Sequence, residues 1–139
     1  MARIETVLFA TDASPASQAA EDHAIDLAAR LGARLVVLSV VSGSPTVQAT
    51  RQLAIEAVVQ RARAGGADAT GMTWNGEAGE SIVEAAEAES ADLIVVGTHE
   101  RGAVGRLFLG SVSDHVVRHA RCPVMVVRPT RATVSVGGV

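Results

Sequence analysis

The sequence predicts a single α/β domain with a doubly wound, five-stranded parallel sheet and helices on both faces. Three observations support this fold class. The chain has 139 residues, of which 48% are hydrophobic, and this suits one compact domain with one core. Short apolar runs bounded by turn residues are typical of buried parallel strands. These runs alternate with segments of helical periodicity, which favours parallel strands joined by helical crossovers.

The first strand and helix are marked by clear boundary residues. The apolar run Thr6–Ala10 predicts a strand, and Ser14 is a natural N-cap for the segment that follows. A helix is expected over Ala16–Leu31, and Gly32 ends it. The residues expected on its apolar face are Ala20, Ala24, Leu27, Ala28 and Leu31.

The second and third strands flank a longer helix. Leu35–Val41 is a continuous apolar run, whereas Asp68–Trp74 is more polar and alternating, as an edge strand would be. Between them a helix is expected over Val47–Arg63. Its inward-facing residues are expected to include Leu53, Ala57 and Val58.

The last two strands complete the alternation. A helix over Gly79–Ser90 leads to the strand Asp92–Val96, and a helix over Ser111–Ala120 leads to the strand Pro123–Val127. The apolar face of the first of these helices is expected to hold Ile82, Val83 and Ala86, with glutamates on the opposite face. We therefore expect one domain at residues 1–129, followed by a tail.

The tail Thr130–Val139 shows a brief alternation that permits either an extra edge strand or disorder. We assign it no function.

The ligand site is expected where strand order reverses, outside the carboxyl ends of the strands. Three loops should meet there: Ala10–Ser14, Val40–Gly43 and Gly97–Ser113. The third loop is glycine-rich and feeds a helix that begins at Gly110-Ser111, so backbone N–H groups and a helix dipole can hold a phosphate. From the residues alone, a flexible surface loop before a capped helix explains this segment equally well.

Composition excludes several other functions. The net charge of -3 and the lack of a basic run argue against a nucleic-acid partner, and no segment has the roughly 20 apolar residues that cross a membrane. All 12 basic residues are arginine, which excludes a Walker lysine and Schiff-base chemistry. The lone Cys122 is expected to be a buried structural thiol. Without a signal-peptide pattern, the expected location is cytoplasmic.

Other constellations do not indicate catalysis or metal binding. His115 and His119 have a spacing that suits two metal ligands, but an exposed helix face has the same spacing, and we predict no metal site. A nucleophile elbow of the GxSxG type is absent, which argues against a serine hydrolase. No catalytic residue is assigned.

The sequence resembles the universal stress protein family over about Ile4 to Pro129. The matching segments are Asp12 and Ser14 after the first strand, the run Asp92–His99, the run Leu109–Ser113, and Cys122-Pro123-Val124. The resemblance implies a five-stranded doubly wound sheet. It also implies a homodimer that pairs the last strands, here Val124–Arg128.

Members of the ATP-binding branch carry Gly-x-x-Gly, nine residues, and then Gly-Ser/Thr. This chain matches at Gly97, Gly110 and Ser111 but has Glu100 in place of the second glycine. At an effective dielectric near 20, a carboxylate about 4 Å from a phosphate charge costs roughly 4 kcal/mol. Arg101 or Arg106 can offset this charge if either lies near it.

The resemblance also implies a ligand and its contacts. The ligand is ATP or another adenine nucleotide, with or without Mg²⁺. Asp12 would bind the ribose hydroxyls, although Asp12 before Ala-Ser-Pro is also good chemistry for an Asx turn. The adenine would meet backbone groups of Ala10, Thr11 and Val40. The phosphates would be lined by Gly97, His99, Gly110, Ser111, Val112 and Ser113.

An enzyme of the adenine-nucleotide α-hydrolase-like class would normally carry a Ser-Gly-Gly-x-Asp-Ser loop after the first strand, where this chain has Thr11-Asp12-Ala13-Ser14, so any turnover should be slow. Two further functions remain open at this stage. The first is a dimeric, adenine-nucleotide-binding stress-response module, with at most slow ATP hydrolysis or autophosphorylation on Ser111 or Ser113. The alternative is a family member that has lost ATP binding and acts as a dimeric protein-interaction module. Glu100 is the residue that favours the alternative.

Overall fold

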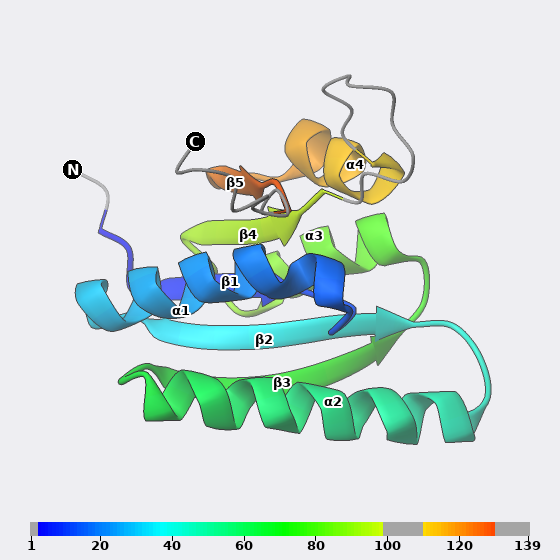
Figure 1. The fold of residues 1–139 in the computed structure, drawn as a ribbon. Coiled ribbons are helices and arrows are strands. Elements are labelled where there is room, and N and C mark those ends of the chain that lie inside the picture. Colours follow the sequence, from blue (N-terminus) through cyan, green and yellow to red (C-terminus); the bar gives the residue numbers. More distant parts are fainter. Residues whose placement is uncertain (1–2, 99–109, 130–139) are drawn as a thin grey trace, which may run out of the picture.

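The computed structural model describes residues 3–98 and 110–129, and Figure 1 shows its alternating strands and helices. The tail 130–139 and its predicted boundary lie outside the described residues. Pro15–Ser17 forms a short 3-10 turn before the first helix. The helices and strands are β1 (Thr6–Ala10), α1 (Gln18–Leu31), β2 (Arg34–Val41), α2 (Pro45–Ala64), β3 (Asp68–Asn75), α3 (Ala78–Ala88), β4 (Leu93–Gly97), α4 (Ser111–His119) and β5 (Val124–Val127).

The five strands form one sheet in the order β3-β2-β1-β4-β5, and all four neighbouring pairs are parallel. The predicted fold class is therefore confirmed, and β3 lies at an edge as expected. The chain runs from β1 outward to β3 and then returns to the other side of β1 for β4. Strand order thus reverses between β1 and β4, and this point is the expected ligand site of an open α/β sheet.

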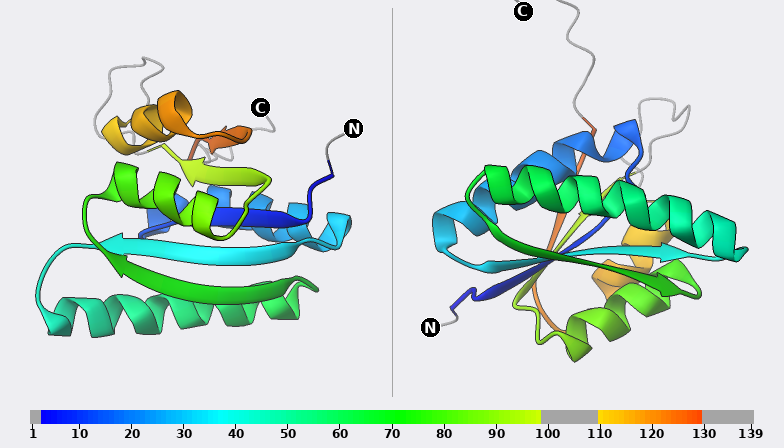
Figure 2. Two further views of the ribbon diagram at one scale, coloured as in Figure 1. Left: turned by 180° about the vertical axis from the view of Figure 1, so that it is seen from behind. Right: turned by 90° about the horizontal axis from the view of Figure 1, so that it is seen from below.

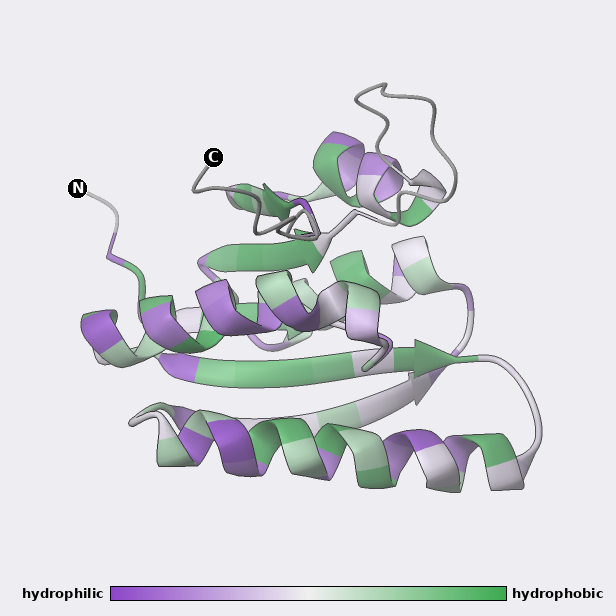
Figure 3. Ribbon diagram, in the orientation of Figure 1, coloured by the Kyte–Doolittle hydropathy of each residue, from purple (hydrophilic) through white to green (hydrophobic). Residues whose placement is uncertain are grey.

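Within the described ranges, α1 and α2 cover one face of the sheet and α3 and α4 cover the other, as the view from below in Figure 2 shows. On one face, Phe9 and Val37 pack with small residues of α1 and with Ile55 of α2. On the other face, Leu8 and Leu38 pack with residues of α3 and α4. Figure 3 shows the central strands as almost continuously hydrophobic, because each strand is buried on both sides.

Most of the residues that were predicted to face inward on α1 are buried or partly buried. Ala20, Ala24 and Ala28 are buried against the sheet, and Leu27 is partly buried. Leu31 was predicted to face inward but is 46% exposed. It occupies the last turn before Gly32, whose φ of +63° turns the chain away from the helix axis into β2.

The predicted inward face of α2 was wrong for two residues. Leu53 is 69% exposed and Ala57 is also exposed, whereas Val58 is buried as expected. The buried stripe consists of Ile55, Val58, Val59 and Ala62. Helix α2 carries apolar residues around much of its circumference, so periodicity alone does not determine which side faces the sheet. The close approach of α2 to β3 decides it.

Gly71 on β3 permits this close approach. A Cβ at this position would lie 2.8 Å from Cγ2 of Ile55 and 2.9 Å from Cγ2 of Val59. We expect Gly71→Ala to lower the free energy of unfolding by about 1–3 kcal/mol, because α2 must move away from the sheet. Urea denaturation measures the loss. The exposed neighbour provides the control: Thr70→Ala should have a smaller effect, and equal losses would contradict the steric explanation.

Cys122 is only partly buried, although the sequence predicted a buried thiol. It precedes β5 and packs against the hydrophobic cluster beneath α3 and α4. Burial raises the pKa of the Cys122 thiol, with a smaller contribution from the Asp92 carboxylate. A thiol with a raised pKa is less reactive at neutral pH, which agrees with a structural role.

Within the described ranges, none of the helices is long and apolar enough to cross a membrane.

Candidate functional site

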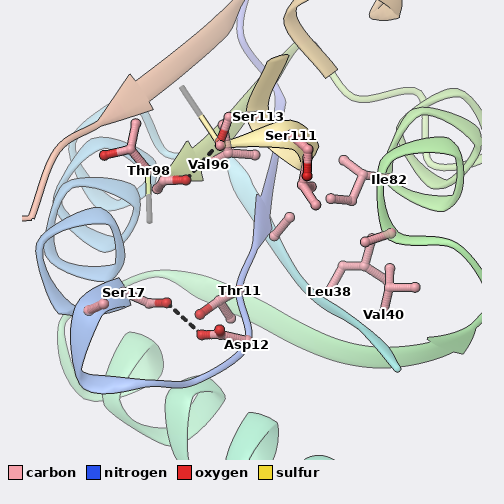
Figure 4. A pocket seen from close by; sticks show the side chains of 16 residues that line it. Thr11, Asp12, Ser17, Leu38, Val40, Ile82, Val96, Thr98, Ser111 and Ser113 are labelled. Carbon is pink, nitrogen blue, oxygen red and sulfur yellow. Dashed lines mark hydrogen bonds between the residues drawn. The ribbon is translucent and has the colours of Figure 1, made fainter. Parts of the chain in front are cut away.

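A pocket of about 320 Å³ opens at the carboxyl edge of the sheet, beyond the ends of the neighbouring strands β1 and β4. Figure 4 shows its lining side chains. The lining includes every predicted ligand-binding residue that the structure describes: Ala10, Thr11, Asp12, Val40, Gly97, Gly110, Ser111, Val112 and Ser113. His99, the remaining predicted site residue, lies outside the described residues, as does Glu100.

One part of the pocket is apolar. Leu38 and Val40 project from β2 on the face that carries α3, since alternate strand residues share a face. In Figure 4, Ile82 of α3 lies beside Leu38 and Val40 on the same side of the pocket, and all three belong to one hydrophobic cluster. A flat, largely apolar group such as a purine base fits this chemistry, since its ring faces are apolar and its edge can bond to strand backbone.

A tight turn after β1 places Asp12 at the pocket. Oδ1 of Asp12 accepts hydrogen bonds from the backbone N–H of Ser14 and from the Ser17 hydroxyl, each at 2.9 Å. The Asx turn that the sequence allowed therefore forms, and Asp12 also lines the pocket. The two interpretations are compatible. Ser14 precedes the 3-10 turn as expected, but its hydroxyl makes no cap hydrogen bond there.

The N-terminus of α4 forms another wall. Gly110 is the N-cap residue, and as a glycine it has no side chain that could cap the first turn. Ser111 is exposed, whereas Ser113 is 3% exposed and donates its hydroxyl hydrogen to the Gly97 carbonyl oxygen at 2.9 Å. This bond joins the end of β4 to the start of α4. The N–H groups at the start of α4 can therefore bind an anion in the pocket.

Sequence reasoning missed seven residues that also line the pocket: Ala16, Ser17, Leu38, Ala78, Ile82, Val96 and Thr98. Strand alternation provided a signal for Leu38, which lies two residues from Val40 on β2 and therefore on the same face. No sequence signal placed Ala78 and Ile82 here, because α3 reaches the pocket through its packing against β2 and α4.

Helix α3, which forms part of the pocket wall, has the charged residue Glu77 as its N-cap. Glu77 accepts hydrogen bonds from the backbone N–H of Glu80 at 2.8 Å and of Gly79 at 2.9 Å. These bonds, the one from Glu80 above all, hold the pKa of the Glu77 carboxyl below its ordinary value of 4.5. His115 lowers it slightly further.

A lowered pKa in the folded state means that Glu77 stabilises the protein when it is charged. Its contribution is fully present above the ordinary pKa of 4.5 and is lost as the pH falls through the lower pKa of the folded state. We expect Glu77→Gln to lower the urea midpoint at neutral pH, and we expect this difference to shrink well below pH 4.5. A difference that stays constant across this range would contradict the assignment.

The two histidines of α4 stack on each other. Their ring centroids are 4.1 Å apart, and Nδ1 of His119 lies 2.8 Å from the His115 carbonyl oxygen. His119 is exposed, as expected, while His115 packs against Gly79 of α3. In the part of the chain that the structure describes, no group of three or more His, Cys, Asp or Glu side chains can hold a metal ion.

Fold and site together define a class of protein. A parallel sheet in this order, with a pocket at its switch point and a helix N-terminus facing that pocket, defines the doubly wound α/β proteins that bind ligands at the carboxyl edge of the sheet. Comparison with known proteins gives the family. The model of the universal stress protein family matches residues 3–128, and the chain belongs to this family.

Two relatives of known sequence match this chain over most of their own length. A universal stress protein of Thermus aquaticus is 38% identical over 135 residues, which cover 89% of this chain and 98% of the relative. A universal stress protein of Methanocaldococcus jannaschii is 33% identical over 137 residues, covering 88% of this chain and 81% of the relative.

Solved structures agree in fold. A universal stress protein solved in complex with cAMP superimposes with a TM-score of 0.75 at 28% sequence identity, covering 93% of this chain and all of that one. The bound nucleotide belongs to that protein.

Proposed function

We propose that this protein is a dimeric stress-response module that binds an adenine nucleotide, with ATP as the main ligand. One observation carries the proposal: the turn after β1, the end of β2 and the N-terminus of α4 meet in a single pocket. This pocket joins an apolar wall to a helix N-terminus that can hold anions, and a nucleotide requires both. The relative that was solved with cAMP supports the same ligand class.

In this proposal each wall binds one part of the nucleotide. The adenine lies against Val40 and meets backbone groups of Ala10 and Thr11, and Asp12 binds the ribose hydroxyls. The phosphates lie at the start of α4, with Gly97, Gly110, Ser111, Val112, Ser113 and His99 as their expected contacts. Mg²⁺, where present, would be held by the phosphates together with water.

The proposed dimer pairs the segment Val124–Arg128 with the same segment of a second copy. Among the described strands, β5 lies at the edge of the sheet opposite β3, and Val124, Met125 and Val126 are only partly buried. An edge strand with apolar side chains is a suitable surface for strand pairing.

We also propose a cytoplasmic location, with which a single cysteine with a raised pKa is compatible.

The proposal is tested first by direct binding. Protein purified without added nucleotide is denatured, and the released supernatant is analysed by chromatography for adenine nucleotides. ATP, with and without Mg²⁺, is then titrated calorimetrically into protein freed of nucleotide. Trp74, the only tryptophan, gives an independent optical signal because it pairs in register with Val40. The proposal would be contradicted if no adenine nucleotide copurifies and the stripped protein shows no measurable ATP binding.

The alternative function rests on Glu100, which replaces a glycine of the ATP-binding pattern. If this carboxylate repels the phosphates, the natural protein will bind no ATP and Glu100→Gly will bind it. That result would favour a dimeric interaction module over a nucleotide-binding one. Binding by both proteins would support the proposed function and would mean that Glu100 is accommodated.

A further inference from the structure

Ser17 lies in the pocket although the sequence did not predict it as a site residue. It ends the 3-10 turn that leads into α1, and it is 8% exposed. Its hydroxyl donates a hydrogen bond of 2.9 Å to Oδ1 of Asp12, drawn as a dashed line in Figure 4. A buried hydroxyl bonded to a carboxylate forms a charge-assisted hydrogen bond, which is stronger than one between neutral groups.

The backbone around this pair is held by local bonds. The N–H of Ser17 donates to the Ser14 carbonyl oxygen at 2.9 Å, and this bond fixes the Ser17 main chain. The N–H of Ala13 donates to the Thr11 hydroxyl at 3.0 Å, and Ala13 has a φ of +61°, which an alanine rarely adopts. The turn thus has one well-determined shape, and Ser17 approaches Asp12 from a fixed position.

Two donors meet the same carboxylate oxygen. The Ser14 N–H reaches Oδ1 from the turn itself, and the Ser17 O–H reaches it from the following helical turn. The Ser17 hydroxyl reaches Oδ1 from a different element than the Ser14 N–H, and it limits rotation of the carboxylate about the bond that joins it to Cβ. Ser17 therefore contributes to the orientation of the carboxylate.

We propose that Ser17 is a positioning residue that orients the Asp12 carboxylate toward the ribose hydroxyls and so makes the site selective for ribonucleotides. The inference rests on the proposed function, because it assigns Ser17 a role in the same nucleotide site. A site that hydrogen-bonds a substrate hydroxyl discriminates against the analogue that lacks it. Removing the Ser17 hydroxyl should therefore weaken that discrimination.

The test compares ATP with 2′,3′-dideoxyATP, which lacks both ribose hydroxyls. For Ser17→Ala we expect ATP affinity to fall about three- to tenfold, which is the size of effect that the loss of one ordinary hydrogen bond has, with the affinity for the dideoxy nucleotide within about twofold of wild type. Ser17→Thr keeps a hydroxyl and should retain most of the preference for ATP. In an Asp12→Ala background, Ser17→Ala should have no further effect on ATP binding.

Ser81→Ala is the matched control. Ser81 is also 8% exposed and lies on α3 outside the pocket lining, so its removal should not change the ratio of the two affinities. Thermal melting of each variant shows whether it is folded. If Ser17→Ala weakens both nucleotides equally, or weakens neither, the positioning role is wrong while the proposed function stands.

If the natural protein does not bind ATP, the comparison is made in the Glu100→Gly background. Absence of binding in that background too would overturn both the proposed function and this inference. A preference for ATP that persists unchanged in Ser17→Ala would overturn only the inference.

Discussion

Replacing Ser111 by glutamate is expected to weaken ATP binding by about a thousandfold without destabilising the fold. Ser111 is the first residue of α4, is exposed and lines the pocket where the phosphates are proposed to lie. A carboxylate about 4 Å from one phosphate charge costs roughly 4 kcal/mol at an effective dielectric of 20, which corresponds to about three orders of magnitude in Kd.

The same substitution should favour the folded protein. An acidic side chain in the first turn of a helix interacts favourably with the helix dipole. Affinity and stability should therefore change in opposite directions, which separates a local effect on the site from general damage. Calorimetric titration measures the first and urea denaturation the second.

Ser111→Gln has nearly the same size as Ser111→Glu but no charge, and it is the control. It should lose far less affinity than the glutamate variant. Similar losses in both variants would mean that side-chain size, rather than charge, governs binding, and would place the phosphates elsewhere.

Phe9→Ala is expected to lower the free energy of unfolding by about 3–5 kcal/mol. Phe9 is fully buried in β1, the central strand, and packs in the cluster beneath α1 and α2. A domain of this kind has a total stability of about 5–15 kcal/mol, so the variant should be close to unfolding.

Urea denaturation followed by circular dichroism measures this loss. Phe9→Leu leaves a much smaller cavity and should retain most of the stability. A loss under about 1 kcal/mol in Phe9→Ala would show that the core can collapse around the missing ring, contrary to its close packing.

The strands could be predicted because each one carries its own signal. β1, β2 and β4 are apolar on both faces, so each appears in the sequence as a short apolar run between turn residues. The more polar, alternating pattern of Asp68–Trp74 identified β3 as an edge strand. Parallel order then followed from the alternation with helices.

The side of α2 that faces the sheet could not be predicted in this way. Leu53 and Ile55 are both apolar and point in different directions around the helix, and packing on the sheet, where Gly71 leaves room for Ile55, distinguishes them. An exposed leucine is compatible with a stable helix, since single apolar residues are common on protein surfaces.

The sequence by itself determined the fold class, the strands and the loops that carry Asp12, Gly97 and Ser111, because these are properties of neighbouring residues. Tertiary structure alone decided that Ser17 bonds to Asp12, that α3 supplies a wall of the pocket through Ile82, and that Ser113 joins α4 to the end of β4. Such contacts depend on the distances between packed helices and strands, and these distances are set by how all the side chains of the core pack together. They therefore cannot be predicted from patterns of neighbouring residues in the chain.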